Sequence, residues 1–284
     1  MTRISLICTV SILLLLSSCS EPDSDKTDEV SSAVDAPVAG TPQVVASGDG
    51  LLFMAPIWSP DGSLIAFTSG QYRGLWVVRP DGSDLAQITD AESAGYRFQW
   101  APDNTAITAR IARYDGPERY FAIASYHIET GSKSILEDFS RASIDPPAKP
   151  VELPRDFGEQ TALNATFSPD STKIAFQLMG DTVYVMTADQ PKSPPDTYRQ
   201  LGQGEQPVWM PDGEHIIVTV SGDDGHHITE SDLYAVHSES GERILLTGHT
   251  DLIALQPDIS PDGRHLVFSC YNSGNIYIME LLLP

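Results

Sequence analysis

A single pentapeptide, written five times, constrains most strongly what this 284-residue chain can fold into. Each copy has a large apolar residue, a small or flexible residue, Pro-Asp, and a fifth residue that closes a turn. Proline presets φ near −65° for the first corner of a tight turn. Aspartate accepts hydrogen bonds from nearby backbone N–H groups, and glycine adopts the positive φ that ends the turn. The copies are WSPDG (58–62), WAPDN (100–104), FSPDS (167–171), WMPDG (209–213) and ISPDG (259–263).

Strand-like segments rich in β-branched and aromatic residues follow these turns. First strands are predicted at 64–69, 173–178, 215–220 and 265–270, and second strands at 75–82, 182–189, 233–241 and 275–281. Third strands are predicted at 85–89, 133–137 and 243–247. Each pentapeptide therefore marks one β-hairpin within a repeated all-β unit.

The repeat spacing predicts the architecture. The shared prolines at 60, 102, 169, 211 and 261 are 42, 67, 42 and 50 residues apart. Periods of about 40–45 residues with four strands per unit are typical of β-propeller blades. We expect five four-stranded blades, and a degenerate sixth blade in the longest interval is the alternative. Residues 43–47 resemble the segment before the last turn motif, so they are expected to supply the outer strand of the last blade and close the ring.

The motif residues have structural roles in this interpretation. The large apolar residues are expected to fill the spaces between adjacent blades: Trp58, Trp100, Phe167, Trp209 and Ile259. Asn104 tolerates positive φ, whereas Ser171 does so poorly, so the third turn is expected to have a different shape.

The layout W-S-P-D-G, I-A-F, I-Y-V, D-G resembles the WD-repeat-like propellers of the TolB family over about 85% of the chain. The resemblance implies the fold but not the function, because similar blades occur in periplasmic scaffolds, peptidase accessory domains and some sugar lyases. We expect no counterpart of the N-terminal α/β domain that TolB carries.

The N-terminus predicts a bacterial lipoprotein. Residues 1–18 have a short positive start and an apolar run that is too short for a membrane span, which is typical of a signal peptide. They end in Leu-Ser-Ser before Cys19, which resembles a lipobox, so diacylglycerol and acyl chains such as palmitate are expected on Cys19. Residues 19–42 form a polar, acidic tether that cannot bury enough surface to fold, and residues 43–284 form the propeller. Because Ser20 follows Cys19, we expect the outer membrane, facing the periplasm or the cell surface.

Charge and cysteine content exclude some classes of partner. A formal net charge of −22 repels nucleic acid and anionic lipid surfaces, so contact with a membrane is expected only through the lipid anchor. The third cysteine, Cys270, lies on a predicted strand and is expected to be a buried thiol.

The expected binding face is the one opposite the SPDG turns, where the loops have uneven lengths. It comprises 70–74, 90–97, 109–120, 140–162, 221–232 and 247–257. A cationic, aromatic patch is predicted there for an envelope protein or a peptide, because arginine and tyrosine suit recognition of carboxylates. Its residues are Arg73, Arg97, Arg110, Arg113, Tyr114, Arg119 and Tyr120. The alternative is that these arginines neutralise nearby acidic loops.

Few residues suggest catalysis. The loop 221–232 contains carboxylates and imidazoles that are candidates for a divalent cation, Asp223, Asp224, His226 and His227, but their spacing matches no defined metal site. The chain has no nucleophile elbow, H-E-x-x-H, phosphate-binding loop or CxxC pair, and no cofactor is expected. The sequence therefore favours a non-catalytic docking lipoprotein. The alternative is a carbohydrate- or peptide-acting enzyme, or a ligand binder, with its site at the channel mouth.

Overall fold

The predicted hairpins assemble into antiparallel sheets in the computed structural model of the chain. The structure describes residues 38–48, 50–142, 144–146, 161–178, 180, 182–188 and 198–282. The signal segment, Cys19 and residues up to 37 of the expected tether lie outside the described residues. Among the described residues the one helix is a single 3-10 turn, η1 (Gly70–Tyr72). No helix in this part of the chain is long and apolar enough to cross a membrane.

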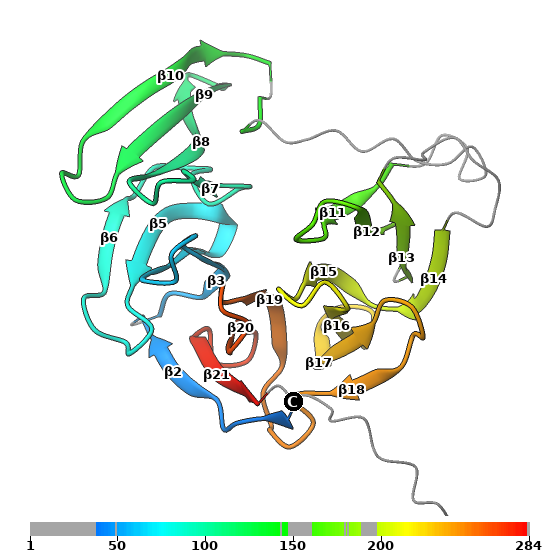
Figure 1. The fold of residues 1–284 in the computed structure, drawn as a ribbon. Helices are drawn as coiled ribbons and strands as arrows, with labels where there is room; N and C mark the ends of the chain where they lie inside the picture. Colours follow the sequence, from blue (N-terminus) through cyan, green and yellow to red (C-terminus); the bar gives the residue numbers. More distant parts are fainter. Residues whose placement is uncertain are drawn as a thin grey trace, which may run out of the picture. The chain divides into compact units, whose positions relative to one another are not determined.

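The described residues form five antiparallel sheets, and in four of them the strands follow one another in chain order from the inner to the outer edge (Figure 1). The first sheet contains β3 (Phe53–Trp58), β4 (Ile65–Ser69), β5 (Arg73–Val78) and β6 (Ala86–Thr89). The second contains β7 (Gln99–Trp100), β8 (Ala106–Asp115), β9 (Glu118–His127) and β10 (Lys133–Ser140). The third contains β11 (Leu163–Phe167), β12 (Lys173–Gln177), β13 (Thr182–Thr187) and β14 (Tyr198–Gln203).

The fourth sheet contains β15 (Glu205–Trp209), β16 (His215–Asp223), β17 (Ile228–His237) and β18 (Arg243–Leu245). The fifth contains β19 (Ala254–Ile259), β20 (His265–Cys270) and β21 (Ile276–Leu282), with β1 (Val38–Ala39) and β2 (Gln43–Ala46) added to β21. Four-stranded meanders of this kind are the blades of β-propellers. The all-β architecture and its hairpins are thus confirmed.

The five SPDG-type turns share one geometry. In each, the backbone N–H of the fifth residue donates to the carbonyl oxygen of the second, at N···O distances of 2.8–3.0 Å. The fifth residue has positive φ in every copy, from 60° at Ser171 to 73° at Gly62 and Gly263. The expectation of a different third turn is therefore wrong. The backbone bond from Ser171 to Ser168 and the hydrogen bonds to Asp170 hold the serine in the conformation that glycine adopts elsewhere.

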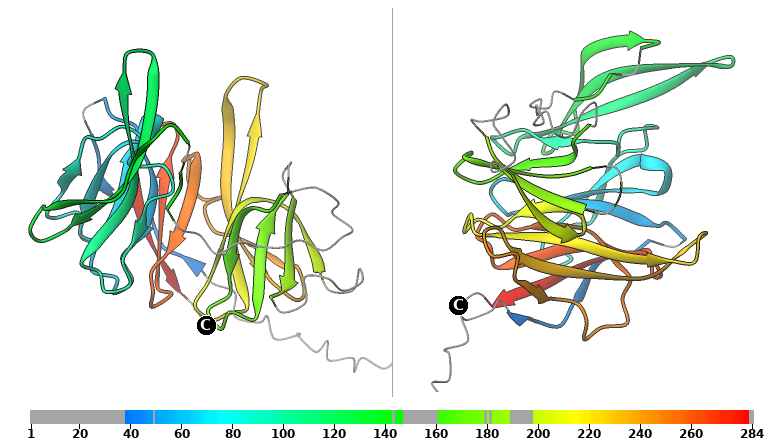
Figure 2. Two further views of the ribbon diagram at one scale, coloured as in Figure 1. Left: turned by 90° about the horizontal axis from the view of Figure 1, so that it is seen from above. Right: turned by 90° about the vertical axis from the view of Figure 1, so that its right-hand side faces the viewer.

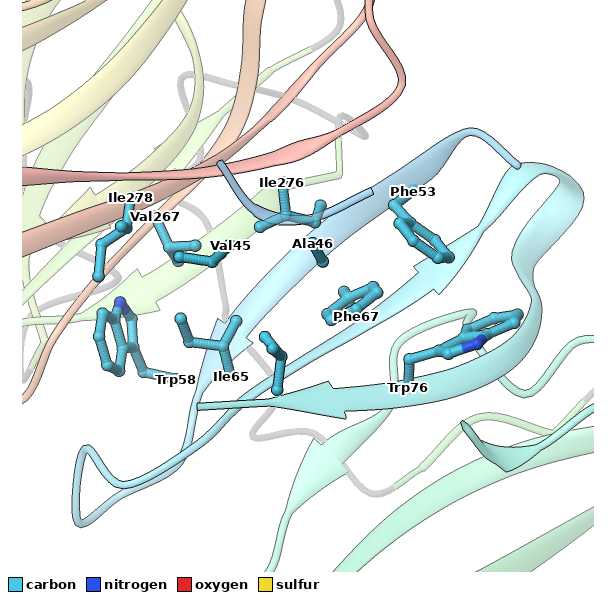
Figure 3. Close-up of a cluster of buried hydrophobic side chains, with 11 residues drawn as sticks. Val45, Ala46, Phe53, Trp58, Ile65, Phe67, Trp76, Val267, Ile276 and Ile278 are labelled. Carbon is cyan, nitrogen blue, oxygen red and sulfur yellow. The ribbon is translucent and has the colours of Figure 1, made fainter. Parts of the chain in front are cut away.

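The predicted pairing of the N-terminal strand with the last sheet is confirmed. Gln43 is opposite Ile278 and Val44 is opposite Tyr277. Pairing with β21 begins before this strand, at Val38, inside the segment expected as tether. Val45 and Ala46 pack in a cluster that joins the fifth sheet to the first (Figure 3).

Apolar clusters fill the spaces between neighbouring sheets. Trp58 packs against Val267 and Ile278 of the fifth sheet, and Ile259 packs with residues of the fourth. The indole N–H groups of Trp100 and Trp209 each donate to a carbonyl of the preceding sheet, at 3.3 and 3.1 Å. These four residues lie between sheets as predicted, whereas Phe167 packs on the cluster of its own sheet. In the described part of the chain, no cluster joins β7–β10 to β11–β14.

A β-bulge interrupts the innermost strand of the first, third, fourth and fifth sheets at the same position. The residue three before the large motif residue has φ between 50° and 54° in all five copies. These residues are Ala55, Arg97, Asn164, Gln206 and Gln256. Bulges bend a strand and re-aim its side chains. Here they direct the backbone N–H groups of the innermost strands toward the neighbouring sheet.

Candidate functional site

Six of the seven residues of the predicted patch lie in or beside the second sheet. Arg110, Arg113 and Tyr114 lie on β8, and Arg119 and Tyr120 lie on β9. The strands form a long hairpin in which Arg113 is opposite Tyr120 and Tyr114 is opposite Arg119. Figure 2 shows the tip of this hairpin on the same side of the sheets as the tip of β16–β17.

Arg97 precedes β7 and has the same positive φ as the bulge residues of the other four sheets. Arg73 is exposed and begins β5 in the first sheet. Among the contacts that the structure describes, none links its side chain to the other six.

Guanidinium groups and aromatic rings alternate along the hairpin. The Arg110 guanidinium lies 4.1 Å from the ring centroid of Tyr96 and 5.0 Å from that of Phe121. The guanidinium of Arg119 lies 5.0 Å from the centroid of Phe121 and 5.6 Å from that of Tyr114. Cation–π attraction at such distances contributes about 0.5–2 kcal/mol per contact. We call this set, with Arg97, Arg113, Tyr120 and Phe139, the arginine–aromatic surface.

Asp145 occupies the inner end of this surface. Its carboxylate accepts from Arg110 at 2.9 Å and lies 3.4 Å from Arg97. The Arg110 side chain is only 12% exposed. These two arginines therefore bind Asp145 at the beginning of the 140–162 insertion. Residues 147–160 of that insertion lie outside the described residues.

Arg113 and Arg119 lie at the outer end and have different partners. The guanidinium of Arg113 lies 4.3 Å from the centroid of Phe139 and 5.8 Å from that of Tyr120. Arg119 donates to the Ser93 hydroxyl at 2.5 Å. None of the ion pairs among the described residues includes either arginine. A guanidinium that lies over a ring still has N–H donors for a carboxylate, so the outer end is suited to an anionic partner.

Amide side chains connect the innermost strands around the channel. The Gln256 side-chain oxygen accepts from the backbone N–H of Ala55 at 2.8 Å, and that of Gln206 accepts from Gln256 N–H at 3.2 Å. The Gln177 side-chain oxygen accepts from Gln206 N–H at 3.3 Å. This amide relay connects four sheets, and Gln206 and Gln256 line a channel cavity of about 380 Å³.

Asp258 is a titratable group in the channel wall. Its carboxylate accepts from the Trp58 backbone N–H at 2.7 Å, so it joins the fifth sheet to the first. The side chain is partly exposed to the channel, yet desolvation by the surrounding protein raises its pKa to about 7. The hydrogen bonds from Trp58 N–H and Ile259 N–H lower the pKa and only partly oppose this effect.

The metal candidates occupy the exposed tip of the β16–β17 hairpin. The Asp224 carboxylate accepts from the backbone N–H groups of His226 and His227 at 2.9 and 2.8 Å, which lowers its pKa. Asp223 accepts from Gly225 N–H at 2.7 Å. These carboxylates thus cap a turn. Across the described residues, no three His, Cys, Asp or Glu side chains converge on a point where they could hold a metal ion.

Comparisons with known proteins give no family assignment. No family model matches the chain. Over 152 residues, 41% of this chain, it is 31% identical to an uncharacterized peptidase, YuxL of Bacillus subtilis, and this match spans 23% of the relative's length.

Solved structures support the fold alone. A chain in the crystal structure of the mitotic checkpoint complex is 12% identical, with a TM-score of 0.55, and the match covers 95% of this chain and 99% of that one. TolB from Acinetobacter baumannii is 14% identical, with a TM-score of 0.39, and the match covers 84% of this chain and 57% of TolB.

Proposed function

We propose that this chain is a non-catalytic, lipid-anchored propeller of five blades, resembling those of the TolB family, that docks another protein of the bacterial envelope. The lipid is carried on Cys19, and residues 19–42 hold the propeller clear of the outer membrane on its periplasmic side. The partner binds the arginine–aromatic surface through a carboxylate-bearing segment.

The outer end of that surface carries the proposal. Arg113 and Arg119 are held against aromatic rings and form none of the described ion pairs, in a chain with a net charge of −22. Tyr114 beside them is 57% exposed. Arginine and tyrosine are enriched among residues that dominate protein–protein binding energy. Arg113 and Arg119 belong to successive cross-strand pairs and so point to opposite faces of the hairpin, and an acidic segment that wraps around the hairpin would gain charge-assisted hydrogen bonds from both without displacing an internal carboxylate.

The distribution of titratable groups favours docking over catalysis. A hydrolase or a metal-dependent lyase needs several His, Asp or Glu side chains directed at one point. In the described residues such groups are dispersed, and the candidate residues 223–227 cap a turn. The rival function, a ligand-binding site at the channel mouth, has a cavity in its favour.

The test is crosslinking and pull-down of the lipidated chain from intact cells. Wild type is compared with an Arg113→Ala, Arg119→Ala variant and with a double lysine variant at the same positions. The matched control is Arg79→Ala, Arg264→Ala, which removes two exposed arginines from the SPDG face. We expect one defined envelope protein to be captured by wild type and by the control.

The alanine variant should lose at least about tenfold of the captured protein, because each charge-assisted hydrogen bond contributes about 1.5–3 kcal/mol. The lysine variant should retain only part of the binding, since lysine keeps the charge but not the planar donor geometry. Equal capture by wild type and the alanine variant, or equal losses in the alanine variant and the opposite-face control, would contradict the proposal.

The lipid anchor has a separate test. A Cys19→Ser variant should no longer incorporate an alkyne-labelled palmitate fed to the cells and should leave the membrane fraction. Labelling that persists in this variant would show that the lipid is attached elsewhere or not through a lipobox.

A further inference from the structure

A cavity of about 760 Å³ lies at the mouth of the channel, on the side that carries the β16–β17 hairpin. Its volume falls within the range of about 300–1,000 Å³ that small-molecule sites occupy. Four sheets contribute to it, through Phe53 of the first, Gly180 of the third, Ser221 of the fourth and Tyr271 of the fifth. The second sheet, which carries the arginine–aromatic surface, contributes none of the described lining residues.

Apolar side chains form much of the cavity wall. Leu52, Phe53 and Met54 line it from the first sheet, and Ile228 and Leu255 line it from the fourth and fifth. Leu52 is 60% exposed, whereas leucine side chains are usually buried. Exposed apolar groups gathered in a concave site favour a ligand with an apolar body.

The floor of the cavity is fixed by the amide relay. Gln206 and Gln256 line both the mouth cavity and the channel below it. Their side-chain oxygens accept from backbone N–H groups of the next sheet, and the Ser269 hydroxyl also donates to Gln256 at 3.0 Å. A ligand would therefore meet a floor that is already ordered, which lowers the entropic cost of binding.

The charged residues that line the cavity are all acidic. Glu205 and Asp223 are the charged residues among its described lining, and no lysine, arginine or histidine of the described chain lines it. The surrounding protein carries a net charge of −22. Clefts lined by one sign of charge concentrate the field, so this mouth attracts cations and repels anions.

From the apolar wall, the fixed floor and the two carboxylates together, we infer that the mouth cavity binds a small amphipathic organic cation. Its ammonium group pairs with Asp223, the charge of Glu205 adds to the negative field of the cavity, and its apolar body packs against Leu52, Phe53 and Leu255. This site is separate from the docking surface on the second sheet, so either function can fail without the other.

The experiment measures binding of three matched probes to the full-length lipidated chain in nanodiscs, by calorimetry near neutral pH. The probes are 4-phenylbutylammonium, 4-phenylbutanol and 4-phenylbutyrate, which share one apolar body and differ in charge. Empty nanodiscs give the baseline for partition into lipid. We expect saturable binding of the ammonium probe, weaker binding of the alcohol, and binding of the carboxylate weaker than the ammonium by about tenfold or more.

A Glu205→Gln, Asp223→Asn variant separates the charge from the cavity. It should bind the ammonium probe about tenfold more weakly while binding the alcohol as wild type does, which shows that the cavity is intact. The Arg113→Ala, Arg119→Ala variant should bind all three probes as wild type does. Absence of saturable ammonium binding, equal affinity for the carboxylate, or ammonium binding unchanged in the Glu205/Asp223 variant would overturn the inference.

Discussion

At the scale of the residue, the carboxyl group of Asp258 makes the stability of the fold depend on pH. Its pKa of about 7 lies above the ordinary value of an aspartate carboxyl, 3.8, so the folded state binds a proton that the unfolded chain has released between these pH values. Stability conferred by this group is therefore present at low pH and lost as pH rises toward 7. The ionised carboxylate then remains desolvated in the joint between β3 and β19.

Replacing this carboxyl with a neutral isostere should remove the contribution of Asp258 to the pH dependence of stability. In Asp258→Asn the side-chain oxygen can still accept from Trp58 N–H, so we expect little change in Tm near about pH 3, where the carboxyl is protonated in both the folded and the unfolded chain. Near about pH 8 the variant should be more stable than wild type, by at most about 4 kcal/mol for a shift of three pKa units and by less where channel water solvates the charge. Thermal unfolding across this range is the measurement. A variant that is no more stable than wild type near about pH 8 would contradict the raised pKa of Asp258.

Ser171 is a second residue whose conformation makes a prediction. It adopts φ 60° at a position where three of the other four turns have glycine. A non-glycine residue in this region costs on the order of 1 kcal/mol. Ser171→Gly should raise Tm slightly, with a gain below about 1 kcal/mol because glycine also increases the entropy of the unfolded chain. Asn104→Gly is the control and should gain less, since asparagine tolerates this conformation. A decrease in Tm in Ser171→Gly would show that the backbone conformation of Ser171 does not destabilise the fold.

At the scale of the element, the amide relay connects the innermost strands. Gln256→Ala removes the acceptor for Ala55 N–H and leaves a donor in the wall of the channel without its partner. Such a change costs about 1–3 kcal/mol, or a decrease in Tm of about 2–4 °C for each kcal/mol in a domain of this size. Gln87→Ala on the exposed strand β6 is the matched control, because its amide bonds only a carbonyl two residues away at 3.4 Å. Equal effects of the two substitutions would show that channel water replaces the relay.

The motif positions of the hairpins could be predicted from sequence, whereas the bulges could not. Pro-Asp-Gly has a local backbone requirement, and four of the five large motif residues lie between sheets as predicted. Three bulge residues precede prolines, at Pro56, Pro207 and Pro257, so a signal was present in the sequence. Whether such a residue forms a bulge depends on a neighbouring sheet that supplies an acceptor for its backbone N–H. A local sequence pattern carries no information about that sheet.

The candidate site, like the fold, could be predicted only in part from the sequence. Arginines close together in a chain of net charge −22 stood out, but sequence spacing could not show that Asp145, 35 residues after Arg110, occupies two of them. Nor could it show that Phe121 and Phe139 support the remaining arginines. Asp258 was missed altogether, because its environment comes from two sheets whose contacting residues are 200 positions apart.

At the scale of the whole molecule, the N-terminal strand holds the fifth sheet to the first. Val45 is buried in the cluster between them, while its neighbour Val44 is 48% exposed on the other face of the same strand. Val45→Asp should therefore destabilise the propeller by about 3 kcal/mol or more, because it buries an unpaired charge. Val44→Asp is the control and should have a small effect. Similar decreases in Tm in the two variants would show that burial of Val45 between the two sheets does not stabilise the fold.

The central claim, that a partner docks on the arginine–aromatic surface, is tested most directly by photo-crosslinking from single positions in living cells. A photoreactive amino acid is placed at Tyr114 on the β8–β9 hairpin or at Asp81 in the β5–β6 turn, on the SPDG face. We expect one discrete crosslinked species from position 114 and none from position 81. The species from position 114 should be lost when Arg113 and Arg119 are changed to alanine. No species from position 114, or the same species from both positions, would contradict docking on this surface.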